Sequence, residues 1–428
     1  MGRVDGMACF VQRTAPGDVA QVTLRKRSRF ATGQLLQLIE ESPERVVPRC
    51  THYVVDRCGG CQLQHMHGDA QRTTKARIVR DALQRIARRD VALPMVQAGP
   101  QDWEYRRRLT LSLVRRGSRW IGGLHPYDDP VSVFALRECP ISHPSLVDAW
   151  RAVDAASRFL PETTALRVGL RLLDDESVAL VVIGGEEWNQ REQFVGAVRS
   201  VPSGIRDVWW ETGSGTRVQV APGAGPENHG ATNGRDGADD DNAIVAAADA
   251  RANALAFVQI NTAVAAMLRE FVVRAVVARE SRRVVDAYAG SGLLTEQLAR
   301  RGLLVTSVEI DPVATSRAEE RVRDLDSVRI MTGGVEALMS EAIETTRPDV
   351  VIVNPPRRGL EPALPHMLNE SLATGSRYII YISCDPATLS RDLSGLPNWR
   401  ITDLTCFDMF PQTAHVETVC VLEPESVA

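Results

Sequence analysis

The sequence predicts a multidomain protein in which a small N-terminal β-barrel and a central β-rich domain precede a C-terminal doubly wound α/β domain. The chain has 428 residues, more than one ordinary hydrophobic core accommodates. Its first half contains short stretches of alternating apolar and polar residues, which are typical of strands. From Arg283 onward apolar strands alternate with helical patterns, which indicates a parallel sheet between helices. We place the domains at residues 1–47, 48–252 and 253–428.

Composition narrows the class of protein. Hydrophobic residues make up 44% of the chain and charged residues 24%, as in soluble globular proteins. No apolar run approaches the roughly 20 residues that cross a bilayer, and the first residues lack the charged and apolar regions of a signal peptide. We therefore expect a cytoplasmic protein without a membrane partner. In a reducing compartment, clustered members of the eight cysteines are better explained as metal or catalytic ligands than as disulfides.

Charge is unevenly divided along the chain. Residues 1–150 contain 23 Lys and Arg against 15 Asp and Glu, a net charge of +8, and the remainder carries −12. A basic region joined to an acidic one suits a protein that neutralises phosphates with one part and performs chemistry with another. An uneven solvated surface is the alternative explanation.

Basic and aromatic residues come together at two places in the first half. In the predicted barrel, a Pro16-Gly17 turn precedes an alternating stretch at 20–25, and the basic cluster 25–29 follows next to Phe30. A second basic and aromatic patch occupies residues 103–108. Both are candidate surfaces for single-stranded nucleic acid, which binds to positive charge and stacks on aromatic rings.

Residues 71–89 predict a basic amphipathic helix. Its apolar residues recur at helical spacing, and its basic residues lie on other faces, where solvation is the default expectation. These basic residues are Arg72, Lys75, Arg77, Arg80, Arg85 and Arg88. Farther along, alternation at 166–172 and an apolar run at 178–183 predict central strands, and the Gly-, Asn- and Asp-rich stretch 212–242 predicts a flexible acidic loop.

The α/β domain opens with a glycine turn of the kind that binds nucleotides. The strand at 284–285 runs into D-A-Y-A-G-S-G at 286–292, where glycines allow a tight turn and a close approach to a ligand. Glu309 ends the next strand and is placed to accept hydrogen bonds from ribose hydroxyls. Thr295 stands where a dinucleotide motif has its third glycine. The pattern favours S-adenosylmethionine over another nucleotide or a purely structural turn.

Three later segments carry polar groups at the ends of strands. N-P-P-R-R-G at 354–359 follows an apolar strand, and its prolines fix an extended turn that projects Asn354. S-C-D-P-A-T at 383–388 follows another strand, and M-F-P-Q-T-A-H-V-E at 409–417 lies near the C terminus. Together with C-G-G-C-Q-L-Q-H at 58–65 and F-V-Q-I-N at 257–261, in this order, the chain resembles the RNA 5-methyluridine (uracil-5-) methyltransferase family.

The resemblance spans nearly the whole chain and implies a function. It implies an S-adenosylmethionine-dependent enzyme that methylates carbon 5 of a uridine in RNA, with a TRAM domain, an RNA-binding OB-like barrel, at 1–47 and a Rossmann-like class I methyltransferase domain at the C terminus. Cys384 matches the family nucleophile and Glu417 the family base. The residues expected at the cofactor are Gln259, Asp286, Tyr288, Gly290, Gly292, Glu309 and Asn354.

This chemistry explains the residue types. Carbon 5 of uracil is a poor nucleophile, so a thiolate must first add to carbon 6 and make carbon 5 nucleophilic. After methyl transfer, a general base removes the proton on carbon 5 so that the thiolate is eliminated. Judged without its motif, Cys384 would be a small buried side chain, which is what we expect of Cys9, Cys406 and Cys420.

Three positions depart from the family pattern. The family often has Asn where Leu293 stands, Asp or Asn near Gly334, and Asp in place of Asn354. Losing the first two removes hydrogen bonds to the cofactor, which leaves open an RNA-binding protein with a degenerate cofactor site. Asn354 supplies a donor and an acceptor where the family supplies a carboxylate. Methylation of another base, at carbon 5 of cytosine or on an exocyclic amine, therefore stays an alternative.

A cysteine-rich segment predicts a metal centre. Four thiolates, from Cys50, Cys58, Cys61 and Cys139, suit zinc or a 4Fe-4S cluster. The C-G-G-C-Q-L-Q-H core resembles the iron-sulfur members of the family, although the first gap has seven residues where the family usually has five. The resemblance thus implies a 4Fe-4S cluster with a structural or RNA-positioning role. By association it also favours 23S ribosomal RNA over transfer RNA as substrate, and we expect a monomer.

Overall fold

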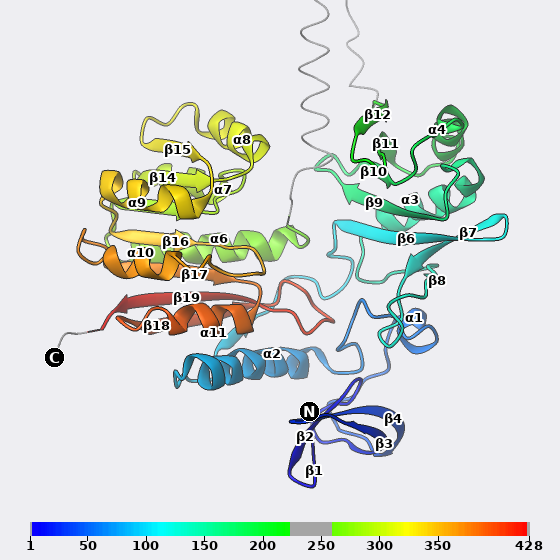
Figure 1. Ribbon diagram of the computed structural model, residues 1–428, viewed down its shortest axis with the longest axis horizontal. Coiled ribbons are helices and arrows are strands. Elements are labelled where there is room, and N and C mark those ends of the chain that lie inside the picture. Colours follow the sequence, from blue (N-terminus) through cyan, green and yellow to red (C-terminus); the bar gives the residue numbers. More distant parts are fainter. Residues whose placement is uncertain (1, 223–258, 426–428) are drawn as a thin grey trace, which may run out of the picture. The chain divides into compact units, whose positions relative to one another are not determined.

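The computed structural model describes residues 2–222 and 259–425, which divide into two compact units (Figure 1). The first unit comprises Met1–Ala70, Gln101–Ala256 and Pro411–Thr413, and the second comprises Gln71–Pro100, Phe257–Phe410 and Ala414–Ala428. Most of the predicted acidic loop, including 239–241, lies outside the described residues. Among the residues described, no helix has the length and apolar character to cross a membrane.

The first unit begins with a four-stranded sheet whose strand order is β1-β2-β4-β3. Its strands are β1 (Gly2–Val4), β2 (Met7–Val11), β3 (Val19–Lys26) and β4 (Ala31–Glu40). β2 and β4 are parallel, and the other two pairs are antiparallel. Few side chains here are buried, and several apolar ones are exposed. So small a core indicates that this sheet presents apolar surface outward.

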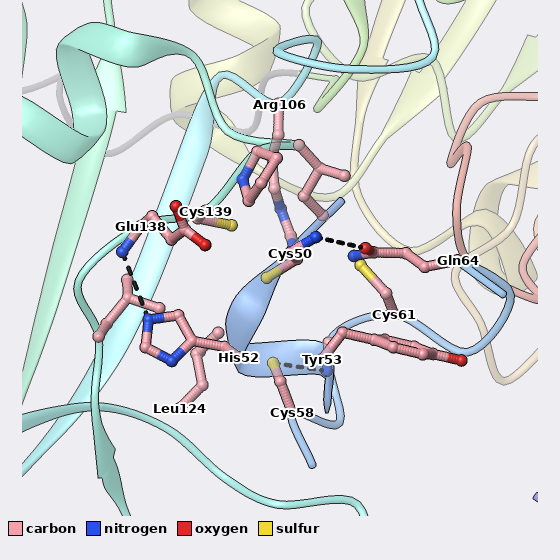
Figure 2. A pocket seen from close by; sticks show the side chains of 14 residues that line it. Cys50, His52, Tyr53, Cys58, Cys61, Gln64, Arg106, Leu124, Glu138 and Cys139 are labelled. Atoms are coloured by element: carbon pink, nitrogen blue, oxygen red, sulfur yellow. Dashed lines mark hydrogen bonds between the residues drawn. The ribbon is translucent and has the colours of Figure 1, made fainter. Parts of the chain in front are cut away.

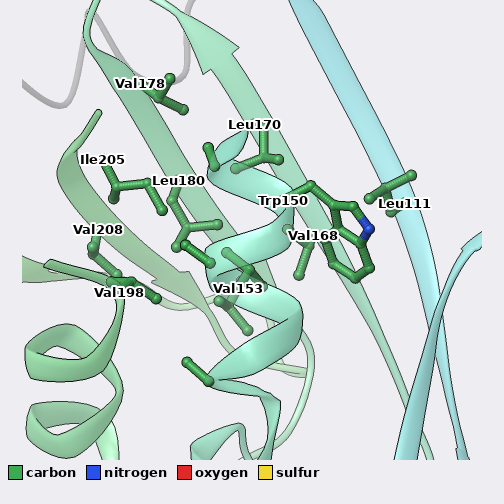
Figure 3. Packing of buried hydrophobic residues seen from close by; sticks show 14 of the residues in the cluster. Leu111, Trp150, Val153, Val168, Leu170, Val178, Leu180, Val198, Ile205 and Val208 are labelled. Atoms are coloured by element: carbon green, nitrogen blue, oxygen red, sulfur yellow. The ribbon is translucent and has the colours of Figure 1, made fainter. Parts of the chain in front are cut away.

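The rest of the first unit is built on a seven-stranded sheet of order β12-β11-β10-β9-β6-β7-β8. The strands are β6 (Arg108–Arg116), β7 (Arg119–Leu124), β8 (Phe134–Ala135), β9 (Ala165–Leu172), β10 (Val178–Ile183), β11 (Ile205–Glu211) and β12 (Arg217–Ala221). The helices are α1 (Thr51–Val54), α3 (Pro144–Ala155), the short 3-10 helix η2 (Ser157–Phe159) and α4 (Arg191–Arg199). Trp150 and Val153 of α3 pack against Val168 and Leu170 of β9 (Figure 3). The predicted central strands are therefore present.

The first part of the predicted acidic loop contains a strand. Residues 217–221, inside the stretch predicted as loop, form β12 and pair with β11 in an antiparallel hairpin. The turn between these strands is closed by backbone hydrogen bonds between Thr212 and Thr216 and from Gly215 to Thr212. Glycine and polar residues here serve a hairpin turn, which composition alone does not distinguish from a loop.

The second unit contains an eight-stranded sheet of order β15-β14-β13-β16-β17-β19-β18-β5. Its strands are β5 (Met95–Gln97), β13 (Arg283–Ala287), β14 (Leu304–Glu309), β15 (Val328–Thr332), β16 (Val350–Val353), β17 (Tyr378–Ser383), β18 (Trp399–Phe407) and β19 (Glu417–Pro424). The first five strands in this order are parallel, and β19 is antiparallel to both of its neighbours. The predicted doubly wound α/β domain is confirmed.

Helices accompany the strands of the second unit. They are α2 (Gly68–Ala82), which continues into the π-helical turn η1 (Leu83–Ala87), α6 (Thr262–Val277), α7 (Leu293–Ala299), α8 (Pro312–Val322), α9 (Val335–Thr346), α10 (Leu364–Glu370) and α11 (Pro386–Ser394). Two hydrophobic clusters contain most of the buried apolar residues of this sheet and these helices. Parallel strands buried on both faces explain the continuous apolar runs in the sequence.

Segment 71–100 lies in the second unit, whereas the sequence placed it in the central domain. Three contacts account for this difference. β5 pairs in parallel with the end of β18. Val79 and Leu83 are buried in a core cluster of the second unit. Arg89 donates hydrogen bonds to the carbonyl oxygens of Trp399, Leu393 and Leu396. These contacts link positions about 300 residues apart in sequence, which local patterns do not reveal.

Candidate active site

Four predicted site residues lie at the carboxyl ends of neighbouring parallel strands. Tyr288 follows β13, Glu309 ends β14, Asn354 follows β16 and Cys384 follows β17. The register pairs the last residues of these strands, Ala287 with Val308 and with Val353. Ligands of open α/β sheets bind at this edge, so the fold brings together the residues that the sequence singled out.

The glycine turn after β13 has the backbone that its sequence predicts. Gly290 and Gly292 have φ values of +58° and +73°, which favour glycine. A Cβ at Gly292 would lie 2.7 Å from the Cβ of Ala318, so the close approach of α8 also requires glycine. Thr295, which stands in place of a third glycine, donates a 2.7 Å hydrogen bond to the carboxylate of Asp286. Burial raises the pKa of Asp286 to about 6.

Two groups at this turn have free capacity for a ligand. The carboxylate of Glu309 accepts hydrogen bonds from the backbone N–H of Gly290 at 2.8 Å and of Asp311 at 2.9 Å. These bonds orient the carboxylate and leave lone pairs on both oxygens. The hydroxyl of Tyr288 is buried, and no partner for it is found among the described residues. A buried polar atom without a partner is costly, so this hydroxyl is a candidate ligand contact.

Gln259 lies just before α6. Phe257 and Val258 of the same motif lie outside the described residues, and Gln259 itself is half-buried. Asn261 caps α6 by accepting a hydrogen bond from the N–H of Val264 at 3.3 Å. The motif thus contains the start of a helix, and its position leaves Gln259 next to that helix end.

Cys384 and Glu417 lie at the same end of one antiparallel strand pair. Ser383, the last residue of β17, pairs with Thr418 of β19. Cys384 directly follows Ser383, and Glu417 directly precedes Thr418. The two side chains are close enough for the charge of Glu417 to influence the thiol. Cys384 and Glu417, the predicted nucleophile and base, therefore lie at the end of the sheet where the glycine turn also lies.

Burial and charge set the protonation of this pair. Burial raises the pKa of the Cys384 thiol, the charge of Glu417 raises it further, and the guanidinium of Arg357 lowers it. Burial raises the pKa of Glu417 to about 7, and Arg357 opposes that shift. Glu417 is 7% exposed. A carboxylate with a pKa near neutrality can act as a base.

The proline turn after β16 is held by a buried carboxylate. Asp392 of α11 accepts hydrogen bonds from the Tyr381 hydroxyl at 2.6 Å and from the backbone N–H of Leu360 at 2.7 Å. Arg391 donates to the carbonyl oxygen of Arg358 at 2.8 Å. A Cβ at Gly359 would lie 2.5 Å from the Asp392 carboxylate. The helix that follows Cys384 thereby fixes the loop that follows Asn354.

The four cysteines of the predicted metal centre line one small cavity in the first unit (Figure 2). Cys50, Cys58 and Cys61 are buried, and Cys139 is half-buried. Burial raises the pKa of Cys58 to about 11 and that of Cys61 to about 12. In residues 2–222 and 259–425, no group of three or more His, Cys, Asp and Glu is arranged so that it could hold a metal ion. The four thiols nevertheless line the same cavity, which sequence spacing alone could not establish.

Contacts around this cavity tie its two cysteine segments together. The backbone N–H of Arg137 donates to Nε2 of His52 at 2.9 Å, and Thr51 donates to the carboxylate of Glu138. The Tyr53 hydroxyl and Nδ1 of His65 are hydrogen-bonded at 2.7 Å.

Cys9, Cys406 and Cys420, expected to be core residues, are each 2% exposed or less.

Comparisons with known proteins agree with this geometry. A family model described as tRNA (uracil-5-)-methyltransferase matches residues 246–425. An uncharacterized RNA methyltransferase of Gloeobacter violaceus is 30% identical, over 98% of this chain and 92% of the relative. The chain belongs to the S-adenosylmethionine-dependent RNA (uracil-5-)-methyltransferase family.

Two further relatives extend over the whole length. The 23S rRNA (uracil(1939)-C(5))-methyltransferase RlmD of Edwardsiella ictaluri is 28% identical, over 99% of this chain and 92% of the relative. The structure of the Pyrococcus abyssi tRNA (uracil-54, C5)-methyltransferase in complex with S-adenosyl-L-homocysteine has a TM-score of 0.65 and 24% identity. The structural match covers 96% of this chain and 95% of the Pyrococcus abyssi chain, so the two proteins share a fold.

The structure places the three residues that depart from the family pattern. Leu293, at the start of α7, is 37% exposed. At Gly334, an added Cβ would lie 2.7 Å from a carboxylate oxygen of Glu336, so the Glu336 side chain occupies the space beside this glycine. Asn354 is exposed, and its backbone N–H donates to the carbonyl oxygen of Ala287 at 3.2 Å.

Sequence reasoning did not single out four residues that interact with the candidate site residues or their loops. Arg357 lies within the N-P-P-R-R-G motif, so its motif could have identified it. Tyr381, Asp392 and Glu336 carry no local signal, because a lone tyrosine in an apolar strand or an acidic residue on a helix is common. Their contacts appear only when the strands and helices are assembled.

Proposed function

We propose that this methyltransferase transfers a methyl group to carbon 5 of a specific uridine in 23S ribosomal RNA through a covalent bond between Cys384 and the uracil. Transfer RNA is the second substrate class to test. The observation that supports the mechanism most strongly is the position of Cys384 and Glu417 at the same end of β17 and β19, with charge interaction between them. Relatives named RlmD align with 99% of the chain, which supports ribosomal RNA.

The proposed reaction has two covalent stages. The Cys384 thiolate adds to carbon 6 of uracil, which makes carbon 5 nucleophilic. S-adenosylmethionine would supply the methyl group to carbon 5, with its sulfur–methyl bond broken and S-adenosylhomocysteine as the leaving group. Glu417 then accepts the proton from carbon 5, the bond between carbon 6 and Sγ breaks, and the thiolate is restored. The positive charge of Arg357 lowers the pKa of both Cys384 and Glu417, and it therefore favours the anionic form of each.

The cofactor is proposed to lie along the strand ends of the second unit. Its site would be formed by Gln259, Asp286, Tyr288, Gly290, Gly292, Glu309 and Asn354. Within this set, Glu309 is oriented by two backbone N–H groups, and the buried hydroxyl of Tyr288 lacks a partner among the described residues. Asp286 is 2% exposed and bound by Thr295, so its part is to hold the turn.

Gly334 has no side chain to accept a hydrogen bond from the cofactor, where the family often has Asp or Asn. Glu336 is proposed to supply this hydrogen-bond acceptor instead. Its carboxylate stands beside Gly334 and influences the pKa of Tyr288. Glu336→Gln should therefore weaken S-adenosylmethionine binding, measured by calorimetry, by about tenfold, the equivalent of one hydrogen bond to a charged group. Glu341→Gln, on an exposed face of the same helix, is the matched control. Unchanged affinity in Glu336→Gln would contradict this assignment.

The four cysteines are proposed to hold a 4Fe-4S cluster. They line one cavity, and four thiolates are the donor set of such clusters. When bound, the cluster would link the segments around Cys50 and Cys139, which the His52 and Glu138 hydrogen bonds already join. Protein purified without oxygen should contain about four irons and four sulfides per chain. Zinc in their place would overturn the proposal.

The N-terminal sheet is proposed to be a TRAM-type domain that binds RNA. Phe10 and Phe30 are exposed and form an edge-to-face pair with ring centroids 5.8 Å apart. The basic cluster 25–29 lies at the end of β3, next to Phe30. Exposed rings beside positive charge suit stacking of unpaired bases with phosphate neutralisation.

Nucleoside analysis tests the proposed function. The protein is incubated with methyl-labelled S-adenosylmethionine and with unmodified ribosomal or transfer RNA, and the labelled nucleoside is identified. Label in 5-methyluridine of ribosomal RNA is expected. Label in 5-methylcytidine or in an N-methylated base, the alternative suggested by Asn354, would overturn the assignment of the target base. Label only in transfer RNA would overturn the assignment of ribosomal RNA as the substrate.

The pKa of Glu417 gives the reaction a pH dependence. Burial raises this pKa to about 7, so at lower pH Glu417 is protonated and cannot accept the proton from carbon 5. The single-turnover rate of thiolate elimination should rise with pH up to about 7 and then level off. Quenched-flow measurement of the covalent adduct checks this, and an elimination rate that falls between pH 6 and pH 7 would contradict it.

A further inference from the structure

Lys75 is a fully buried cation on a helix that the sequence predicts to be solvated on its basic faces. It lies on α2, its side chain is 0% exposed, and its Nζ is 2.5 Å from Oδ1 of Asp408. Nζ also donates a 2.9 Å hydrogen bond to the carbonyl oxygen of Phe410. Arg72, one turn earlier, is 4.0 Å from the other oxygen of Asp408. The basic helix thus directs one of its charges into the core.

Such a buried ion pair calls for an explanation beyond stability. Taking two charges out of water costs several kcal/mol per ion, and apolar residues of similar volume are often equally stable or better. Val79 and Leu83, farther along the same helix segment, are buried in a hydrophobic cluster of the second unit. Stability alone therefore does not explain a lysine and an aspartate at this place.

The pair holds one end of the connection that leads to Glu417. Phe407, the last residue of β18, pairs with Glu417, the first residue of β19. Asp408 directly follows Phe407, and its backbone N–H also donates to the carbonyl oxygen of Gln97 at 2.9 Å. Lys75 contacts both Asp408 and Phe410, so it fixes the first three residues of the connection between the strands.

We propose that Lys75 is a positioning residue for Glu417. By holding Asp408 and Phe410, Lys75 keeps the β18–β19 connection in the one arrangement that directs the Glu417 carboxylate at the carbon 5 proton. Lys75 does not touch the reacting atoms. Its contacts are to Asp408 and Phe410 of the β18–β19 connection and not to Cys384, which directly follows β17, so we expect its effect to fall on elimination. This inference rests on the proposed role of Glu417 as the base.

The test is the fate of the covalent adduct in a double variant, Lys75→Met with Asp408→Leu. Replacing both partners leaves no unpaired buried charge, so the variant should fold. It should form the adduct at the wild-type rate and eliminate it about tenfold more slowly, so that RNA-bound protein accumulates on denaturing gels. Arg77→Met removes the same charge from an exposed position of the same helix and should leave the adduct fraction unchanged.

Two results with the folded double variant would overturn the inference. One is elimination at the wild-type rate, and the other is a defect confined to adduct formation. If the double variant does not fold, Lys75→Gln with Asp408→Asn takes its place, because it too removes both buried charges and keeps polar groups that can hydrogen-bond each other. Accumulated adduct would then support the inference, and wild-type elimination would refute it. Failure of the proposed function is distinguishable, because wild-type protein would then form no 5-methyluridine and Glu417→Gln would accumulate no adduct.

Discussion

Cys384→Ala should abolish methylation and form no covalent complex with RNA. Without the thiolate, carbon 6 of uracil receives no nucleophile and carbon 5 stays unreactive, so the rate should fall on the order of 10⁴-fold or more. The change is small and the site is only partly buried, so the fold should persist. Incubation with RNA and S-adenosylmethionine, followed by denaturing electrophoresis and nucleoside analysis, measures both effects.

Cys406→Ala is the matched control for Cys384→Ala. Cys406 lies on β18 and is fully buried in the core of the second unit. Removing the buried thiol leaves a small cavity, which should lower the free energy of unfolding. The covalent complex should still form. A covalent complex that survives in Cys384→Ala would show that another residue is the nucleophile.

Glu417→Gln should have the opposite effect on the covalent complex. Glutamine keeps the shape of the side chain and cannot accept a proton, so methyl transfer proceeds while elimination slows about 10²- to 10⁴-fold. The complex should therefore accumulate, carrying the transferred methyl group. Single-turnover assays with labelled S-adenosylmethionine, resolved on denaturing gels, follow the label from RNA-bound protein to free RNA.

Glu423→Gln, near the other end of β19, provides the control for Glu417→Gln. Glu423 forms a salt bridge with Arg400, whose side chain is half exposed, and removing it should not change elimination. Rapid release of methylated RNA by Glu417→Gln would contradict the assignment of Glu417 as the base.

Much of the catalytic unit was predictable from the sequence, because its signals are local. Continuous apolar runs predicted parallel strands, and D-A-Y-A-G-S-G predicted a turn in which Gly290 and Gly292 adopt positive φ. The polar residues at strand ends follow from the same logic, since parallel strands present their carboxyl ends at one edge. The structure accordingly brings Tyr288, Glu309 and Asn354 to that edge.

The features that sequence reasoning missed depend on contacts between distant segments. β5 has three residues and no pattern of its own, yet its pairing with β18 helps to place segment 71–100 in the second unit. Lys75 looks like its basic neighbours until Asp408 is found against it. Asp392 gains its role only because α11 returns to the proline turn.

The cysteine site lies between these cases. The sequence predicted Cys50, Cys58, Cys61 and Cys139 as four thiolate ligands, and the family resemblance implied an iron-sulfur cluster. That the four line one cavity became visible only in the folded chain.

The most direct test of the proposed mechanism is peptide mapping of the complex trapped with RNA that contains 5-fluorouridine. Fluorine at carbon 5 cannot be removed as a proton, so elimination stops after methyl transfer and the wild-type protein should stay bound. Mass spectrometry of the digested complex should find the methylated, fluorinated uridine attached to the peptide that contains Cys384. Its attachment to any other residue, or methylation without a covalent complex, would contradict the account.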